Sequence, residues 1–378
     1  MSEQKRIPVV ILRGGTSKGI YIKANDLPAD PVQRDEVILR IFGSPDVRQI
    51  DGLAGADPLT SKLAIIGPSS RPDADVDYTF AQVSINERVV DYNGNCGNIS
   101  SGVGPFAIDE SIIKAQEPIT KVRIHNTNTG KMLYAEVQVR DGKARVKGDC
   151  VIAGVPGTGA PILMDFASTA GAATGKVLPT GNPVDVLETK RGPINVSIVD
   201  VANPCVFVRA ADVNMKGTEP PAIIDGDSDL LDCLEEIRSK CCVMIGMAKS
   251  PEDAMKNSPA FPMVAFVAEA ADYVDFTSGS IISKGNVDIV SRLMYMQVLH
   301  KTYAGTATAC TGAAAKIEGT IVNQLIPRAN ELDVIRIGHP AGVIPVVANV
   351  DGIKVKRAAL IRTARRIMEG YVFIPDEK

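Results

Sequence analysis

The sequence contains no tryptophan, and aromatic residues make up only 4% of it. This composition argues against stacking surfaces for nucleobases or sugar rings. Its 41 Lys and Arg residues nearly balance 44 Asp and Glu residues, so no basic surplus exists to hold a phosphate backbone or an anionic lipid surface. We therefore expect neither nucleic acid nor a membrane among the partners of this protein.

Long apolar runs are also missing from the chain. The longest, such as residues 261–268 and 343–348, are much shorter than the roughly 20 residues that a membrane span needs. Residues 1–6 are polar, unlike the start of a signal peptide. The sequence therefore predicts a soluble, cytoplasmic protein. Its oligomeric state does not follow from these residues, and a homo-oligomer remains open.

The seven cysteines form no CxxC pair and no Cys/His spacing of the kind that binds zinc. We interpret them as free thiols and expect no metal. Neither GxGxxG nor a P-loop motif occurs, and no serine-nucleophile motif is present. The expectation is a protein that uses no cofactor.

The chain has 378 residues, which is enough for two domains of ordinary size, each with its own core. Residues 167–183 are rich in Ala, Gly and Thr and form the natural crossover between two halves. We place the boundary near residue 184, which gives domains at 1–184 and 185–365.

Local patterns predict an α/β protein of α+β type in both halves. Short apolar and β-branched runs between turns indicate strands at 8–12, 19–22, 62–66, 78–84, 122–126, 195–198, 205–209 and 263–268. Helical spacing predicts helices at 31–42, 97–113 and 287–299, and a further small-residue helix opening around 308–312. The helix at 97–113 is apolar on every side, so we expect a sheet to wrap it.

Cys96 lies in a turn of Gly and Asn at residues 93–98, directly before that buried helix. A helix start offers unpaired N–H groups and the positive end of a dipole, which together bind carboxylates and lower the pKa of a thiol. Such a thiol can act as a base near neutral pH. The alternative is a buried structural cysteine, which residue type alone favours.

Lys62 stands at the start of an apolar strand, after Ser61. Its side chain either faces solvent, as most lysines do, or enters a partly dry site, where a lowered pKa makes it a usable acid or base. The turn at residues 13–19 is rich in Gly and hydroxyl groups and could bind an oxyanion. Cys310 repeats the arrangement of Cys96 at the predicted start of the second small-residue helix.

These pieces occur in the order found in diaminopimelate epimerase: Cys96-Gly97-Asn98, then the segment at 202–206, then the segment at 307–312. Cys205 replaces the histidine of that enzyme, and no amino-group-binding pattern is evident. Across nearly its whole length the chain more closely resembles the branch that contains 2-methylaconitate and 3-methylitaconate isomerases. The RGGTSKG turn at 13–19, DPLTSK at 57–62 and GNCGN at 94–98 carry this resemblance.

The resemblance implies a fold of two similar domains, each a curved, mostly antiparallel sheet wrapped around a central helix, with the active site in the cleft between them. It also implies that residues 366–378 return as a strand to the first domain. It assigns the acid/base roles to Lys62 and Cys96. The expected substrate-binding residues are Thr16, Ser17, Lys18, Ser61, Asn95, Gly97, Asn98, Asn203, Cys310, Thr311 and Gly312.

The implied activity is a 1,3-proton shift in a small unsaturated di- or tricarboxylate. The best match is 3-methylitaconate to 2,3-dimethylmaleate, and isomerisation of 2-methylaconitate is the alternative within the branch. Two other hypotheses stay open. One is an amino-acid epimerase with Cys96 and Cys310 as opposed bases, and the other is a small-carboxylate binding protein on the same fold.

Overall fold

The computed structural model describes residues 3–376 of the chain. Two compact units are formed. Of the described residues, the first unit comprises 3–151, 157–164 and 362–376, and the second comprises 152–156 and 165–361. Residues 1–2 and 377–378, which the predicted first domain includes, lie outside the described residues.

The first unit is built on a mixed sheet in the order β23-β1-β2-β3-β4-β6-β7-β8. The β2–β3 and β4–β6 pairs are parallel and the others are antiparallel. Its strands are β1 Gln4–Gly14, β2 Ser17–Lys23, β3 Lys62–Pro68, β4 Val76–Val83, β5 Val90–Asp91, β6 Ile119–Asn126, β7 Lys131–Arg140, β8 Lys143–Ala144 and β23 Ala364–Pro375. Its helices are η1 Ala24–Asp26, α1 Pro31–Phe42, α2 Gly97–Ser100 and α3 Val103–Asp109.

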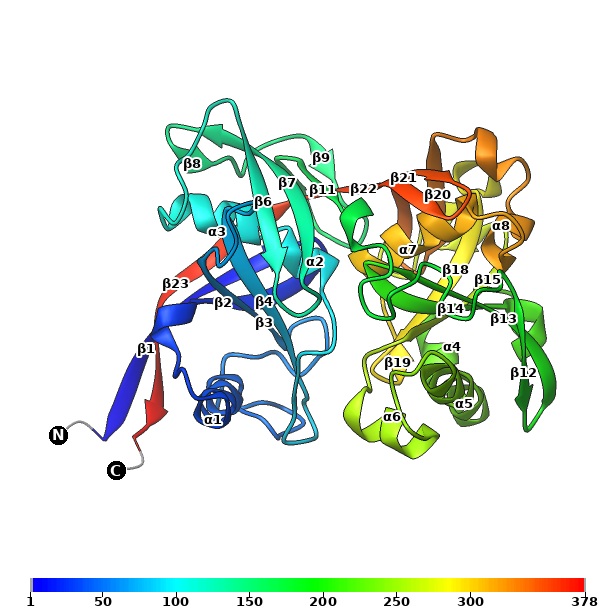
Figure 1. Ribbon diagram of the computed structural model, residues 1–378, viewed down its shortest axis with the longest axis horizontal. Helices are drawn as coiled ribbons and strands as arrows, with labels where there is room; N and C mark the ends of the chain where they lie inside the picture. The colour runs from blue at the N-terminus through cyan, green and yellow to red at the C-terminus, as the bar shows by residue number, and fades with distance from the viewer. Residues whose placement is uncertain (1–2, 377–378) are drawn as a thin grey trace. The chain divides into compact units, whose positions relative to one another are not determined.

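The two faces of this sheet carry different helices (Figure 1). Ile20, Ile22, Leu63 and Ile65 pack with α1 in one apolar cluster. Because strand side chains alternate between faces, the intervening residues of β2, β3 and β4 point to the opposite side, where α2 and α3 contact the sheet. The predicted helix at 97–113 is thus a central, buried one, interrupted by a turn between α2 and α3.

The second unit repeats this plan. Its sheet runs β12-β13-β14-β15-β18-β20-β21-β22, again with two parallel pairs, β14–β15 and β18–β20. The strands are β12 Asp185–Thr189, β13 Gly192–Val201, β14 Asn203–Arg209, β15 Met263–Glu269, β18 Ile289–Tyr295, β19 Val298–Leu299, β20 Val334–His339, β21 Gly342–Asp351 and β22 Lys354–Arg362. Outer helices α4 Pro221–Asp225, α5 Ser228–Met244 and α6 Pro251–Asn257 lie between β14 and β15, and central helices α7 Gly305–Lys316 and α8 Ile321–Leu325 lie before β20.

The order and direction of strand pairing match element by element, with β1 equivalent to β13, β2 to β14, β3 to β15, β4 to β18 and β6 to β20. One ion pair is repeated with them. Arg123 pairs with Asp75 at 2.7 Å and Arg336 pairs with Asp288 at 2.6 Å, and each arginine follows its aspartate by 48 residues. The internal repeat is therefore real, although few residue identities reveal it.

The remaining elements are short. They are β9 Cys150–Val151, β10 Thr158–Gly159, β11 Ile162–Asp165, β16 Tyr273–Val274, β17 Ile281–Ile282, and the 3-10 turns η2 Ala167–Thr169, η3 Ala210–Val213, η4 Lys284–Asn286 and η5 Ala329–Glu331. Within the described residues, no helix has the length and apolar character that a membrane span requires.

The predicted strands of both halves and the helix at 31–42 are confirmed, and that helix has Asp30 as its N-cap, accepting from the Gln33 amide. The predicted helix at 287–299 is wrong, because the segment forms the hairpin of β18 and β19. Its turn residues Met296 and Gln297 both have positive φ, as a two-residue hairpin turn of type I′ requires. Every residue of β18 is buried, so the segment lacks the alternation of apolar and polar residues that marks a half-buried strand.

The predicted boundary near residue 184 lies inside the second unit. Residues 171–177 are bound to β13, since the Asp200 carboxylate accepts from the amides of Ala173 and Thr174 at 3.0 and 2.8 Å. In addition, the Asp200 amide donates to the Val177 carbonyl. At the other end of the chain, β23 pairs along its length with β1, so the last strand of the first unit comes from residues 364–375.

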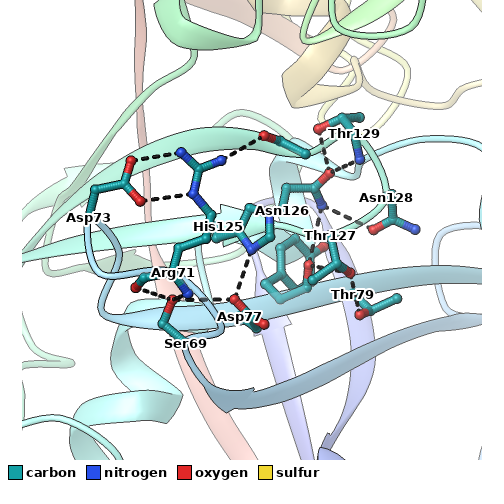
Figure 2. A network of polar contacts seen from close by, with 12 residues as sticks. Ser69, Arg71, Asp73, Asp77, Thr79, His125, Asn126, Thr127, Asn128 and Thr129 are labelled. Carbon is teal, nitrogen blue, oxygen red and sulfur yellow. Dashed lines mark hydrogen bonds and ion pairs between the residues drawn. The ribbon is translucent and has the colours of Figure 1, made fainter.

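A polar network ties the β3–β4 loop and β4 to the β6–β7 turn (Figure 2). Arg71 pairs with Asp73 and donates to the Gly130 carbonyl at 3.2 Å, while His125 Nδ1 lies 2.8 Å from Asp77. Asn128 bonds the backbone N–H and C=O of Phe80, both at 2.8 Å, and donates to the Tyr92 carbonyl. The network therefore holds Phe80 of β4 next to the segment that leads to Cys96.

Candidate active site

Lys62 is the first residue of β3 and is buried, with 3% of its surface exposed. It belongs to the face of the sheet that carries α2 and α3, since its neighbour Leu63 packs with α1 on the other face. Burial lowers the pKa of Lys62, and the nearby Cys96 and Asp57 act in the opposite direction. The sequence allowed either a solvent-facing lysine or a lysine in a partly dry site, and Lys62 is the second of these.

Gln82 holds the Lys62 ammonium group. Lys62 Nζ donates to Gln82 Oε1 at 2.6 Å, and the Gln82 amide nitrogen donates to the carbonyls of Ser61 and Pro58 at 3.0 and 3.2 Å. These two bonds fix the orientation of the amide, so its oxygen faces the lysine. The Phe80 ring lies 5.5 Å from Nζ and closes another side. The sequence prediction missed Gln82, which faces Lys62 across the antiparallel β3–β4 pair.

Cys96 occupies the N-cap position of α2, as the sequence predicted, and is partly buried. The first helical bond runs from the Ser100 amide to the Cys96 carbonyl at 2.7 Å, so the amides of Gly97 and Asn98 precede the hydrogen-bonded turn. Asn95 accepts from the Ser100 hydroxyl at 2.9 Å and shapes this turn. Burial lowers the pKa values of Lys62 and Arg362, and the charge of Cys96 opposes both shifts. The thiol of Cys96 therefore lies within electrostatic range of two cationic side chains.

Asn98 connects the helix start to the glycine-rich turn. Its Nδ2 donates to Thr16 Oγ1 at 3.0 Å, and its Oδ1 accepts from Arg362 Nε at 2.9 Å. Ser17, the next residue, is 2% exposed, and its hydroxyl has no hydrogen-bond partner among residues 3–376. Lys18 donates its amide to the Leu59 carbonyl and so fixes the turn against the segment before Lys62.

Ser61 has a structural role in this geometry. Its hydroxyl donates to the Val83 carbonyl at 2.8 Å and accepts from Gln49 Nε2 at 2.9 Å. Those bonds hold the start of β3 against β4. The first unit therefore brings together Lys62, Cys96, Asn98 and Thr16, with Ser61 and Asn95 as supports, and adds Gln82 and Arg362.

Cys310 does not open its helix, and that prediction is wrong. Helix α7 begins at Gly305, so the amides of Cys310, Thr311 and Gly312 lie inside it, where backbone N–H groups donate to carbonyls four residues earlier. The three residues make contacts inside the second unit. The Cys310 thiol donates to the Val199 carbonyl at 3.2 Å, the Thr311 hydroxyl donates to the Ala307 carbonyl, and Gly312 lies against Val346.

Ala304, rather than Cys310, is the counterpart of Cys96, because each is the N-cap of the central helix of its unit. A repeated hydrogen bond supports this equivalence. Asn203, just after the β13–β14 turn, donates to Thr306 Oγ1 at 2.9 Å, as Asn98 donates to Thr16 in the first unit. In both units the second residue of the central helix is thus bonded to the hairpin turn, with Thr and Asn exchanged.

Cys205 and Cys310 are both fully buried. Burial, together with the hydrogen bond to Cys310, raises the pKa of Cys205 well above its usual value. Such a thiol is a poor proton acceptor near neutral pH. Among the described residues, no cluster of three or more His, Cys, Asp or Glu side chains is placed to hold a metal ion.

Comparison with known proteins gives a consistent result. The family model described as PrpF protein matches residues 4–375. The chain is 73% identical to the 3-methylitaconate isomerase of Eubacterium barkeri over 378 residues, covering 100% of both chains. It is 38% identical to a 2-methyl-aconitate isomerase of Cupriavidus necator over 392 residues, covering 99% of this chain and 98% of that one.

Solved structures agree on the fold. A crystal structure of methylitaconate-delta-isomerase has a TM-score of 0.82 at 73% identity, covering 99% of this chain and 97% of that one. A hydroxyproline epimerase of Agrobacterium vitis has a TM-score of 0.58 at 13% identity, covering 100% and 95%. At that identity the second likeness concerns the fold alone, and it confirms the epimerase-like fold that the sequence predicted.

Proposed function

Because the chain belongs to the PrpF protein family, we propose that it is an isomerase that moves a carbon–carbon double bond in a small unsaturated dicarboxylate. The substrate pair is 3-methylitaconate and 2,3-dimethylmaleate. The observation that carries this choice is 73% identity over the whole length to a 3-methylitaconate isomerase, against 38% to a 2-methyl-aconitate isomerase.

The reaction is a proton transfer between two carbons. A base removes the proton from the carbon that bears the methyl group, and the electron pair delocalises over the neighbouring double bond and carboxylate as a dienolate. Return of a proton to the terminal methylene carbon makes the new methyl group and leaves the double bond between the two substituted carbons. The negative charge delocalised onto the carboxylate is greatest at the dienolate stage. Hydrogen-bond donors that are already in position therefore stabilise that stage most.

Lys62 and Cys96 are the acid/base pair in this proposal. The support is that both lie in one unit, that burial shifts the pKa of Lys62 toward a usable range, and that the two groups interact electrostatically. Thr16, Ser17 and the amides of Gly97 and Asn98 supply donors for a carboxylate. Ser17 fits this role because its buried hydroxyl has no other partner in the described part of the chain.

The two-cysteine epimerase hypothesis has little support in this geometry. It needs a second thiol at a position equivalent to Cys96, and that position holds Ala304. Cys310 is fully buried and donates to Val199. One acid/base centre in the first unit suits a proton shift along a substrate better than inversion between two opposed cysteines.

Proton NMR in deuterated buffer tests the proposal. The purified protein is incubated with 3-methylitaconate and, in parallel, with 2-methylaconitate, and Cys96→Ala serves as the control. Formation of deuterated 2,3-dimethylmaleate that is lost in the control supports the proposal. Turnover of 2-methylaconitate alone would move the assignment to that substrate. Binding of either compound with neither turnover nor deuterium uptake would leave a carboxylate-binding protein.

A further inference from the structure

We infer that Arg362 binds one carboxylate of the substrate beside Cys96 and thereby selects dicarboxylates over monocarboxylates. This rests on the proposed function and names the residue behind its substrate class. Arg362 ends β22, where the chain re-enters the first unit, and is only 1% exposed. Arginine is rarely buried to this extent without an anionic or hydrogen-bonding task.

The orientation of the guanidinium group is set by Asn98. Arg362 Nε donates to Asn98 Oδ1 at 2.9 Å, and Asn98 Nδ2 is directed to Thr16 Oγ1 at 3.0 Å. The amide therefore presents its oxygen to the arginine. A guanidinium carries five N–H groups in a planar fork, and the bond from Nε to Asn98 fixes the direction of that fork. The fork matches the two oxygens of a carboxylate, which a lysine would meet only as a point charge.

The glycine-rich turn is shaped around this pair. A Cβ atom on Gly15 would lie 2.8 Å from Arg362 Cδ and 2.3 Å from Asn98 Oδ1, and the φ of Gly15 is +51°. Both facts require glycine there. The turn therefore lies directly against Arg362 and Asn98, with Thr16 and Ser17 following. The unpartnered hydroxyl of Ser17 is directed to the same face of β2 as Gly19, which lies opposite Lys62 in the parallel pair.

The charges favour a dianion. Burial lowers the pKa of Arg362 to about 9, and the charges of Cys96 and Cys150 oppose that shift. Cys96 also opposes the effect of burial on Lys62. Cys96 therefore lies within electrostatic range of two buried cationic side chains, and buried charge is stable only when it is compensated. A dicarboxylate matches two cationic side chains, with one carboxylate taken by Arg362 and the reacting end left beside Lys62 and Cys96.

The test compares Arg362→Gln and Arg362→Lys with Arg123→Gln, which removes the same charge from an exposed ion pair with Asp75. Each substitution is made in the active enzyme, where kcat and KM are measured. Each is also made in a Cys96→Ala background, where calorimetric titration with 2,3-dimethylmaleate gives Kd. We expect Arg362→Gln to raise KM and Kd at least about tenfold, as loss of a charge-assisted pair does. Arg362→Lys should recover part of the affinity, and Arg123→Gln should change neither constant.

A monocarboxylate separates binding from folding. Tiglate has the carbon skeleton of 2,3-dimethylmaleate with one carboxylate replaced by hydrogen, so wild-type protein should bind it at least about tenfold more weakly, and Arg362→Gln should bind the two almost equally. Equal affinity of the wild type for both ligands overturns the inference even if the variants fail to fold. A folded Arg362→Gln protein with unchanged KM and Kd also overturns it. A wrong proposed function gives a different result, because the wild-type protein would then show no turnover of 3-methylitaconate.

Discussion

Lys62 and Met263 occupy equivalent positions in the two units. Lys62 lies opposite Gly19 in the parallel β2–β3 pair, and Met263 lies opposite Cys205 in the parallel β14–β15 pair. Each is the first residue of its strand. In the second unit Met263 takes the position of Lys62, and Ala304 takes the position of Cys96. The second unit therefore keeps the scaffold and lacks both proposed acid/base groups.

Lys62→Met should therefore give a folded protein without activity. Met263 shows that this position of the fold accepts methionine, and loss of a general acid/base should lower turnover at least about a hundredfold. We also expect a gain in stability at pH 7, because burial lowers the pKa of Lys62 and so makes its ammonium form costly in the folded state.

The pH dependence of that gain has a definite sign. The pKa of Lys62 is lower in the folded chain than its ordinary value of 10.5, so the unfolded chain binds more protons between those two values. The stability advantage of Lys62→Met should be full below the folded pKa and should shrink as pH rises toward 10.5. Urea denaturation of both proteins at several pH values measures it. A variant that is less stable than the wild type at every pH would contradict the argument.

Cys96→Ala and Cys310→Ala should behave differently. The first removes the thiol at the start of α2 and should reduce turnover at least about a hundredfold. The second removes a buried thiol that donates to Val199 and should leave kcat within about twofold while costing roughly 1 kcal/mol of stability. Steady-state kinetics and thermal unfolding of both variants give the answer, and a large loss of kcat in Cys310→Ala with intact folding would restore the two-cysteine mechanism.

Gln82 should set the pH profile through Lys62. Its oxygen accepts from the ammonium group at 2.6 Å and so favours the protonated lysine. Gln82→Met removes the acceptor and should move the limb of the kcat/KM profile that reports Lys62 to lower pH. Gln82→Glu adds negative charge and should move the same limb to higher pH, whether Lys62 acts as acid or as base. Shifts of both variants in one direction, or none, would rule out this positioning role.

The sequence predicted the elements whose side chains follow a clear local pattern. Strands at 62–66 and 205–209 are rich in apolar and β-branched residues, and the helix at 31–42 has a capping Asp30 before Pro31. Segment 287–299 was misassigned because every residue of β18 is buried, so neither period appears. Cys310 was misassigned because the turn that resembles the Cys96 turn is Ala304-Gly305-Thr306, in which alanine replaces the diagnostic cysteine.

Arg362 could not have been found from local sequence. It is separated from Asn98 by 264 residues, and its neighbours form an ordinary strand. Gln82 could have been found from the sequence, because assigning the register of the β3–β4 hairpin places it opposite Lys62. Residue types and short motifs pointed to the proposed acid/base groups, while the groups that orient them come from strand pairing and from the return of the chain.

The pairing of β23 with β1 bears on how the protein matures during synthesis. Residues 165–361 form one continuous stretch, so the second unit needs no residue that is synthesised after residue 361. The first unit must wait for β23 and for Arg362, so its earlier strands leave the exit tunnel long before their final partner does. During that interval β1 lacks its partner along one edge, and an unpaired strand edge is a template for pairing with another chain.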